Sequence, residues 1–198
     1  MASQSWFTQR PPAGLLVAQA VGITASTYLF GENMALSFLS VPPILQAPAP
    51  LAARQWHQLY DIAKSFALPL TAVATVSTAY VAFRQDPASL PFKLNVAAAI
   101  LFPSIIPYTL LVIGPTNEKL FAKEREYQSA SLEDKAIEAG VQKDETVHAL
   151  IDKWAVLNLA RAAITGVGAI LTIWAALDKR EFASFRDIGV GSGANRLG

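Results

Sequence analysis

Residues 154–177 read WAVLNLARAAITGVGAILTIWAAL, an apolar run in which Arg161 is the only charged residue. Three further runs of the same character occupy residues 14–39, 66–83 and 94–113. A helix needs about 20 apolar residues to cross a hydrocarbon core of roughly 30 Å, and each run is of that order. The sequence therefore predicts an all-α fold, an integral membrane four-helix bundle.

The composition agrees with a membrane protein and excludes several other classes. Hydrophobic residues make up 53% of the chain and charged residues only 16%, whereas soluble domains average about a quarter charged. The net charge is +1 and no basic stripe is present, so a nucleic-acid partner is not expected. The chain has no cysteine, which excludes disulfides, thiolate metal sites and cysteine nucleophiles. We expect one membrane domain over residues 1–198, with the lipid bilayer as its surroundings.

The loops carry their own helix signals. Pro42 and Pro43 are predicted to end the first span, because proline interrupts a helix. Residues 51–64 then have the pattern of a short amphipathic helix within the first loop. The third loop, residues 115–153, is predicted to be a small helical lid. Its start signals are a capping-box pattern at Ser131 and a capping carboxylate at Asp144.

Two prolines inside the third span, Pro103 and Pro107, stand one helical turn apart and are predicted to bend it. Beyond that span the charged residues 118–128 are expected to form a separate helix, with Thr116 or Asn117 as its N-cap.

The charges inside the spans gather at one level. Glu32 and Arg161 each lie seven residues from the loop end of their span, which places both about 10 Å below the same membrane face. A lone charge at that depth costs several kcal/mol, so the two mark a functional site or a structural pair. Asn117, His57 and Tyr60 are predicted to lie at the same end of the bundle. These positions predict an amphipathic pocket that opens towards the first and third loops.

Within the fourth span, Trp154, Asn158 and Arg161 follow i, i+4, i+7 spacing and share one helix face. An aromatic ring, an amide and a cation in one stripe suit a bound polar aromatic molecule or an anion. Two structural alternatives remain open: Arg161 reaching to the membrane surface, and Glu32 forming an ion pair with Arg161 or Lys64.

Histidine offers a further route to acid–base chemistry. His57 could serve as a general base near neutral pH. A metal site is not predicted, because His57 and His148, the two histidines, show no metal-ligand spacing.

Three groups of residues carry a family resemblance. They are Trp56-His57-Gln58-Leu59-Tyr60-Asp61 with Lys64, Pro107-Tyr108 and Gly114-Pro115-Thr116-Asn117 with Leu120, and Trp154 with Asn158 and Arg161. Together they resemble the fungal anthrone oxygenase-like family, small four-span membrane proteins found near polyketide biosynthesis genes. The resemblance covers roughly residues 14–177.

The resemblance implies a cofactor-independent oxygenase that uses dioxygen as co-substrate to turn the methylene of an anthrone-like aromatic polyketide into a quinone carbonyl. It also implies that Asn117, Trp154, Asn158 and Arg161 line the site. Many relatives have His where this chain has Asn158, so His57, Asp61 or Glu32 would have to act as the base.

The predicted catalytic residues are therefore Arg161, Asn158, His57 and Glu32. The predicted substrate-binding residues are Trp154, Asn117, Tyr60, Asp61, Lys64 and Thr116. The expected partner is a small aromatic molecule, and the expected location is the endoplasmic reticulum or another internal membrane.

Other functions stay open at this point. The chain could be a non-catalytic tetraspan membrane protein that binds lipid or a partner protein, or a small transporter subunit. A homo-oligomer is compatible with the sequence as well.

Overall fold

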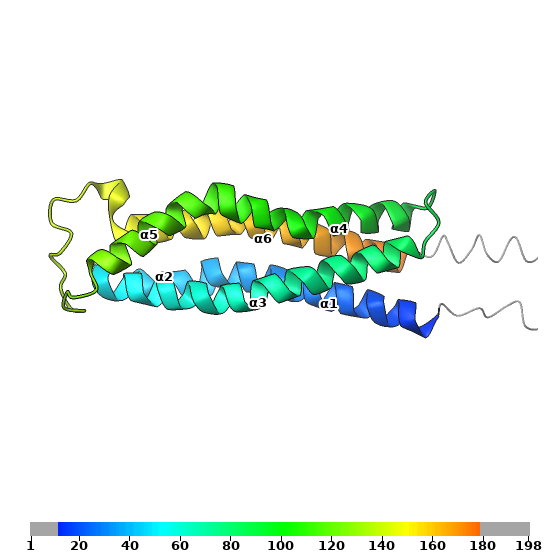
Figure 1. Cartoon of the computed structure of the whole chain (residues 1–198), viewed down its shortest axis with the longest axis horizontal. Coiled ribbons are helices and arrows are strands. Elements are labelled where there is room, and N and C mark those ends of the chain that lie inside the picture. The colour runs from blue at the N-terminus through cyan, green and yellow to red at the C-terminus, as the bar shows by residue number, and fades with distance from the viewer. Residues whose placement is uncertain (1–11, 179–198) are drawn as a thin grey trace, which may run out of the picture.

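The computed structural model describes residues 12–178, which form a bundle of four long helical rods (Figure 1). The elements are α1 (Ala13–Ala35), the π-helix η2 (Leu36–Ser40), α2 (Val41–Ile44), α3 (Ala49–Phe83), α4 (Leu90–Tyr108), the π-helix η3 (Thr109–Ile113), α5 (Gly114–Glu126), the 3-10 helix η4 (Lys143–Glu145) and α6 (Val147–Leu177).

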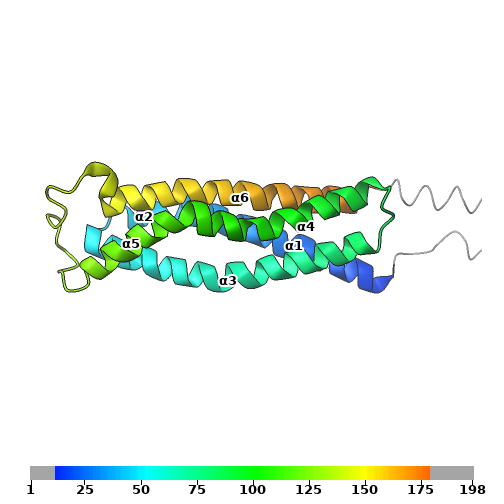
Figure 2. The ribbon, with the colours of Figure 1, turned by 45° about the horizontal axis from the view of Figure 1, so that its top comes forward.

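Each rod is long and apolar enough to cross a membrane. The rods are Ala13–Ile44, Ala49–Phe83, Leu90–Glu126 and Val147–Leu177. α1 packs against α3 and α6, and α4 packs against the same two helices, so the rods close into a four-membered ring. Both ends of the described chain lie at one end of the bundle, opposite the loop that joins α5 to α6 (Figures 1 and 2).

The burial pattern is typical of a helix bundle that lies in a lipid bilayer. Large apolar side chains point outward, with Phe83 83% exposed and Leu111 76% exposed. Polar side chains such as Asn33, Asn158 and Thr165 are buried instead. In lipid, polar groups that face the bundle interior can bond across helices, while apolar groups gain little by leaving the surface. The chain is a multi-pass membrane protein, as its sequence predicts.

Small residues let the helices approach closely on the inner face. Gly168 of α6 lies against Phe102 of α4, which is fully buried. A Cβ atom added at Gly168 would overlap the Phe102 ring. Glycine at this position is therefore required by the contact between α4 and α6.

We expect Gly168→Val to weaken the bundle, because overpacking a core contact costs about 1–3 kcal/mol. The measurement is the thermal unfolding midpoint of the purified protein in one detergent, which should fall by several degrees. Gly31→Val is the matched control, since a Cβ at Gly31 has no neighbouring atom within 4 Å. Equal unfolding midpoints for the two variants would contradict the packing described here.

The first span does not end at Pro42 and Pro43, contrary to the sequence prediction. The helix continues through α2, with both prolines in its first turn after η2. Proline is tolerated in a first turn because its missing N–H group is not needed there. A π-turn also interrupts the regular i→i−4 ladder that a proline ring would otherwise obstruct.

The same arrangement recurs in the third span. η3 is followed directly by Gly114 and Pro115, and the helix runs on into α5. Thr116 and Asn117 lie inside this helix and are buried, so the prediction that one of them caps a separate helix is wrong. Figure 1 shows the α4–η3–α5 rod changing direction midway along its length, as Pro103 and Pro107 predict.

The loops are shorter and less helical than predicted. Residues 51–64 are helical, but they form the first turns of α3 rather than a separate helix. No helix begins at Ser131, whose hydroxyl accepts from the backbone N–H group of Glu133, two residues ahead. Side-chain bonds at that spacing favour turns over helices. The N-cap of α6 is Thr146, not Asp144, because the Thr146 hydroxyl accepts from the Ala149 N–H group.

The loop between α5 and α6 is nevertheless tied to the bundle. Arg54 of α3 donates to the Gln128 carbonyl at 2.6 Å. Glu138 accepts from the Val147 backbone N–H group at 2.8 Å and from the Tyr127 hydroxyl at 3.3 Å. Burial raises the pKa of Tyr127, so its phenol keeps the proton that it donates. In place of the predicted helical lid, this segment is an anchored, turn-rich loop, which is called the lid below.

Candidate functional site

A buried polar cluster joins the first and fourth spans at the level predicted from the sequence. Arg161 of α6 donates from Nε to Asn33 Oδ1 of α1 at 2.8 Å. Its Nη2 group donates to Asn158 Oδ1 on its own helix. The guanidinium is therefore held inside the bundle, and the alternative in which Arg161 reaches to the membrane surface is wrong.

The amide groups of the cluster are fixed in orientation by their own hydrogen bonds. Asn158 Nδ2 donates to the Asn33 carbonyl at 2.7 Å and to Ser37 Oγ at 2.9 Å. Asn33 Nδ2 donates to the Leu29 carbonyl at 2.8 Å. Both amide oxygens must consequently face Arg161. Asn158 cannot replace a catalytic histidine as a base, because its amide does not titrate; it orients the guanidinium.

Glu32 stands beside this cluster without joining it. Its carboxylate interacts electrostatically with Arg161, but the two do not form an ion pair within 4 Å, and neither do Glu32 and Lys64. The structural ion pair considered for Glu32 is thus not formed. Glu32 Oε2 is buried and has no hydrogen-bond partner. An unpaired buried carboxylate oxygen near a cation is costly, and it fits a ligand-binding role.

Tyrosines of two further helices lie on the inner side of the bundle. Tyr60 of α3 and Tyr108 of α4 are both partly buried. The Tyr108 hydroxyl donates to the Leu157 carbonyl of α6 at 3.0 Å, which joins the bent third span to the fourth. The site thus draws on all four rods, with the cation from α6 and the carboxylate from α1.

An aromatic layer lies on the lid side of the cluster. The Trp56 ring packs against Trp154 at 6.1 Å, Tyr60 at 5.5 Å and Phe121 at 5.1 Å between ring centroids. Trp56 and Trp154 are both almost fully buried. Planar apolar surfaces of this kind suit a fused-ring ligand.

Two more buried polar atoms near the layer have no hydrogen-bond partner, Trp56 Nε1 and Asn117 Oδ1. The first is a donor and the second an acceptor. Thr116, next to Asn117, is buried too. Both predicted residues of α5 are thus interior, where a ligand hydroxyl could donate to Asn117 Oδ1.

His57 lies in a different setting from Glu32. Its ring nitrogens approach Asp61 at 3.4 Å and Glu124 at 3.6 Å, and its ring packs edge-on against Phe121. Asp61 is mostly exposed. The pair therefore stands on the lid side of the aromatic layer, while Glu32 stands beside Arg161. His57 remains a predicted base, and the geometry favours Glu32.

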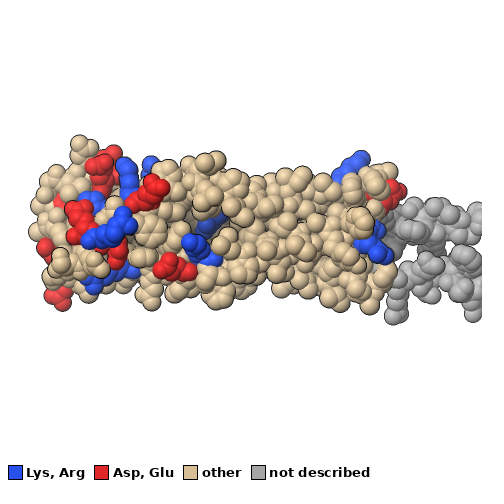
Figure 3. Space-filling view, in the orientation of Figure 1, with Lys and Arg blue, Asp and Glu red and all other residues tan. Residues whose placement is uncertain are grey.

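Lys64 occupies the outer edge of the site. Its side chain is exposed, and Nζ stands 5.8 Å from the centroid of the Tyr60 ring. The face that carries α3 and α4 shows a hollow with lysine or arginine atoms at its floor and edge (Figure 3). Acidic atoms also lie beside the hollow, and most of the other charged residues gather at the two ends of this face.

Sequence reasoning missed several residues of the site. They are Ser37, Trp56, Tyr108, Phe121 and Glu124. Ser37 could have been found, because it follows Asn33 by four residues and so shares its helix face. Trp56, which opens the first motif of the resemblance, is fully buried.

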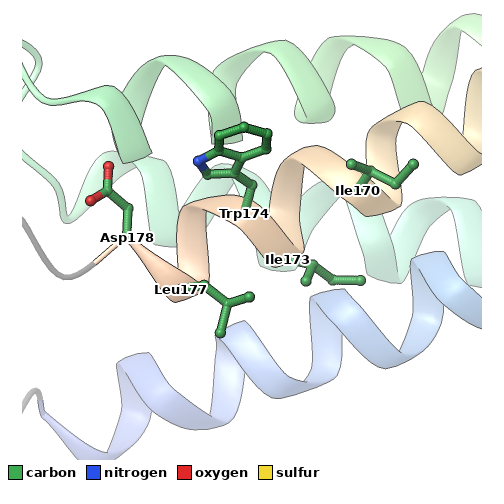
Figure 4. A pocket seen from close by; sticks show the side chains of 5 residues that line it. All are labelled: Ile170, Ile173, Trp174, Leu177 and Asp178. Atoms are coloured by element: carbon green, nitrogen blue, oxygen red, sulfur yellow. The ribbon is translucent and has the colours of Figure 1, made fainter.

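A separate hollow of about 420 Å³ lies at the other end of α6. It is lined by Ile170, Ile173, Trp174, Leu177 and Asp178 (Figure 4). None of the predicted site residues contributes to it. Its walls are largely the outward apolar side chains expected of a lipid-facing surface.

Comparison with known proteins gives a consistent result. The family model described as anthrone oxygenase matches residues 56–171. The chain is 30% identical to the anthrone oxygenase encC of Aspergillus fumigatus, over 82% of this chain and 94% of that protein. It is 33% identical to the anthrone oxygenase nsrD of Aspergillus novofumigatus, over 77% and 88%.

A noranthrone monooxygenase of Aspergillus flavus is 24% identical over 83% of this chain and 75% of that protein. No solved structure matches the chain significantly.

Proposed function

Since the chain belongs to the anthrone oxygenase family, we propose that it oxidises the methylene carbon of an anthrone-like aromatic polyketide to a quinone carbonyl with dioxygen. The relatives named above supply the reaction class through their names. The observation that carries the proposal to particular residues is the half-buried Arg161 cation at the level of the unpaired, buried carboxylate oxygen of Glu32.

Arg161 is suited to bind an oxyanion. A guanidinium has five N–H donors and keeps its charge in proteins. Two of these donors bind the amides of Asn33 and Asn158, which leaves three for a ligand. The amides fix the guanidinium before substrate arrives, so little reorganisation is needed as negative charge develops.

Glu32 is suited to accept the proton. Loss of a methylene proton turns the anthrone into an anion whose charge spreads onto its carbonyl oxygen, where Arg161 stabilises it. The carboxylate has a buried oxygen with no competing donor. General-base catalysis by a positioned side chain contributes typically about 10²–10⁴-fold.

The remaining steps balance with dioxygen alone. The anion transfers one electron to dioxygen, and the resulting substrate radical and superoxide combine to form a C–O bond. Protonation gives a hydroperoxide on the former methylene carbon. Loss of the second proton from that carbon with cleavage of the O–O bond releases water and leaves the carbonyl. One dioxygen thus yields one quinone carbonyl and one water.

We propose that neither a metal nor an organic cofactor takes part, because a phenol-rich anthrone anion is itself a one-electron donor. The edge of the aromatic layer at Tyr60, which is only partly buried, would hold the fused rings, with Trp56 and Trp154 closing the site behind them. We place the protein in the endoplasmic reticulum or another internal membrane, where an apolar polyketide would collect.

We expect the purified protein in lipid nanodiscs to convert a dihydroxyanthrone to the anthraquinone faster than protein-free nanodiscs do. Oxygen uptake should equal quinone formed, and isotopically labelled dioxygen should label the new carbonyl. Dialysis against a metal chelator should leave the rate unchanged. A rate no higher than that of empty nanodiscs would overturn the proposed function, and a rate abolished by the chelator would overturn its cofactor independence.

A further inference from the structure

The aqueous end of the site is closed by packed side chains. Between the lid and Arg161 lie Trp56, Leu120, Ile151 and Trp154, each at most 2% exposed. Trp154 stands seven residues above Arg161 on α6, about 10 Å nearer the lid. The rings of Trp56, Trp154 and Phe121 are in contact. A planar molecule cannot pass through this layer without separating it.

The lid adds a second barrier over the same end. Arg54 holds the Gln128 carbonyl, and Glu138 is bonded to the first turn of α6. His148 Nε2 lies 2.9 Å from the Ala47 carbonyl, which ties α6 to the connection before α3. Entry from the water phase would require several of these bonds to break together.

The side of the bundle is less closed. The hollow in Figure 3 opens on the face formed by α3 and the α4–η3–α5 rod. On α3, Lys64 is exposed and its ammonium lies beside the Tyr60 ring. Tyr60 and Arg161 are both only partly buried. The hollow therefore leads from Lys64 along the Tyr60 ring towards the level of the Arg161 guanidinium.

Exposed apolar residues occur on both elements of this face. Leu110 and Leu111 of η3 are 69% and 76% exposed, and Ile62 and Phe66 of α3 are more than half exposed as well. The helix face of Lys64 also carries Asp61, whose side chain is 66% exposed. The hollow therefore lies where the lipid-facing apolar surface meets the charged end of the bundle, within reach of a molecule dissolved in the outer part of the membrane.

We propose that the substrate enters and the product leaves sideways, between the bilayer and the hollow, past Lys64 and Tyr60. The inference rests on the proposed function for the identity of the substrate, a planar polyphenol that dissolves in lipid. Lys64 holds a phenol oxygen near the interface, where a lysine can keep its charge in water. Tyr60 offers its ring face and separates Lys64 from Arg161.

The absence of cysteine from the sequence allows a direct test. Lys64→Cys is labelled with a benzyl methanethiosulfonate, which fills the path. Lys135→Cys, on the exposed lid, is the matched control and receives the same label. The readout is the rate at which a dihydroxyanthraquinone, preloaded in lipid vesicles, quenches the tryptophan fluorescence of the protein. Trp56 and Trp154 place fluorophores at the site, and quenching does not depend on turnover.

We expect the label at Lys64→Cys to slow quenching at least tenfold, and the label at Lys135→Cys to leave the rate unchanged. An ethylammonium label at Lys64→Cys restores a cation and should recover most of the rate. The lateral route would be overturned if only the label at Lys135→Cys slowed quenching, or if the parent protein showed no saturable quenching. Normal quenching without turnover would refute the proposed reaction instead, so the two failures are distinguishable.

Discussion

Arg161→Met lowers the kcat/KM of the parent protein for a dihydroxyanthrone by about 10³-fold, the loss expected when a pre-organised oxyanion partner is removed. The substitution keeps much of the side-chain volume and removes the only cation bonded to both Asn33 and Asn158. Arg161→Lys keeps the charge but cannot reach both amide oxygens with fixed geometry. We expect it to recover only a small part of the loss.

The controls for Arg161 address folding. Losing the guanidinium leaves two buried amide oxygens without donors, at a cost of about 1–3 kcal/mol each. Rates are therefore compared only for variants with a monodisperse elution profile and the parent's helix content. Arg84→Met, an exposed arginine at the far end of α3, should retain full activity. Activity of Arg161→Met within threefold of the parent would show that the oxyanion does not lie at Arg161.

Glu32→Gln is expected to lower kcat by about 10²–10⁴-fold, the range for loss of a general base. Glutamine has nearly the same shape, and it can still hydrogen-bond the substrate, so KM should change little. In the parent, kcat should rise with pH as the carboxylate loses its proton. The variant should lack that rise, since the amide does not titrate.

The pH profile also separates Glu32 from His57. If His57 were the base, His57→Gln would remove the rise in kcat and Glu32→Gln would keep it. Glu133→Gln, an exposed lid carboxylate, controls for a general loss of charge. A Glu32→Gln profile that superimposes on the parent profile at equal kcat would remove Glu32 from the mechanism.

The fold could be predicted well because the thickness of the membrane requires apolar helices of a recognisable length. The fourth span, predicted as residues 154–177, ends where α6 ends and extends upward to Val147. Hydropathy alone misses this extension, but the capping signal at Asp144 predicts a helix that runs on into the span, and the structure places its start two residues later, with Thr146 as the N-cap. The continuous third rod was missed for a related reason: η3 accommodates Pro115, and a π-turn leaves no recognisable sequence signal.

The site was predicted in part. Equal depth placed Glu32 and Arg161 at one level, and the structure leaves them there without an ion pair within 4 Å. Depth alone could not show that Arg161 would bond to Asn33 instead of Glu32, because that choice depends on how α1 rotates against α6. Ser37 and Asn33 set this rotation by bonding Asn158 and the Ala155 carbonyl across the interface.

The most direct measurement of whether Glu32 and Arg161 act on one bound substrate is a double-mutant cycle on kcat/KM. When two residues stabilise the same transition state, removing either one already loses most of that stabilisation. The effects of the two substitutions are therefore strongly non-additive. We predict that Glu32→Gln combined with Arg161→Met is about as slow as the slower single variant. If the fold-loss in kcat/KM of the double variant equals the product of the two single fold-losses, the two groups work independently. That result would contradict a single site in which both groups act on one substrate.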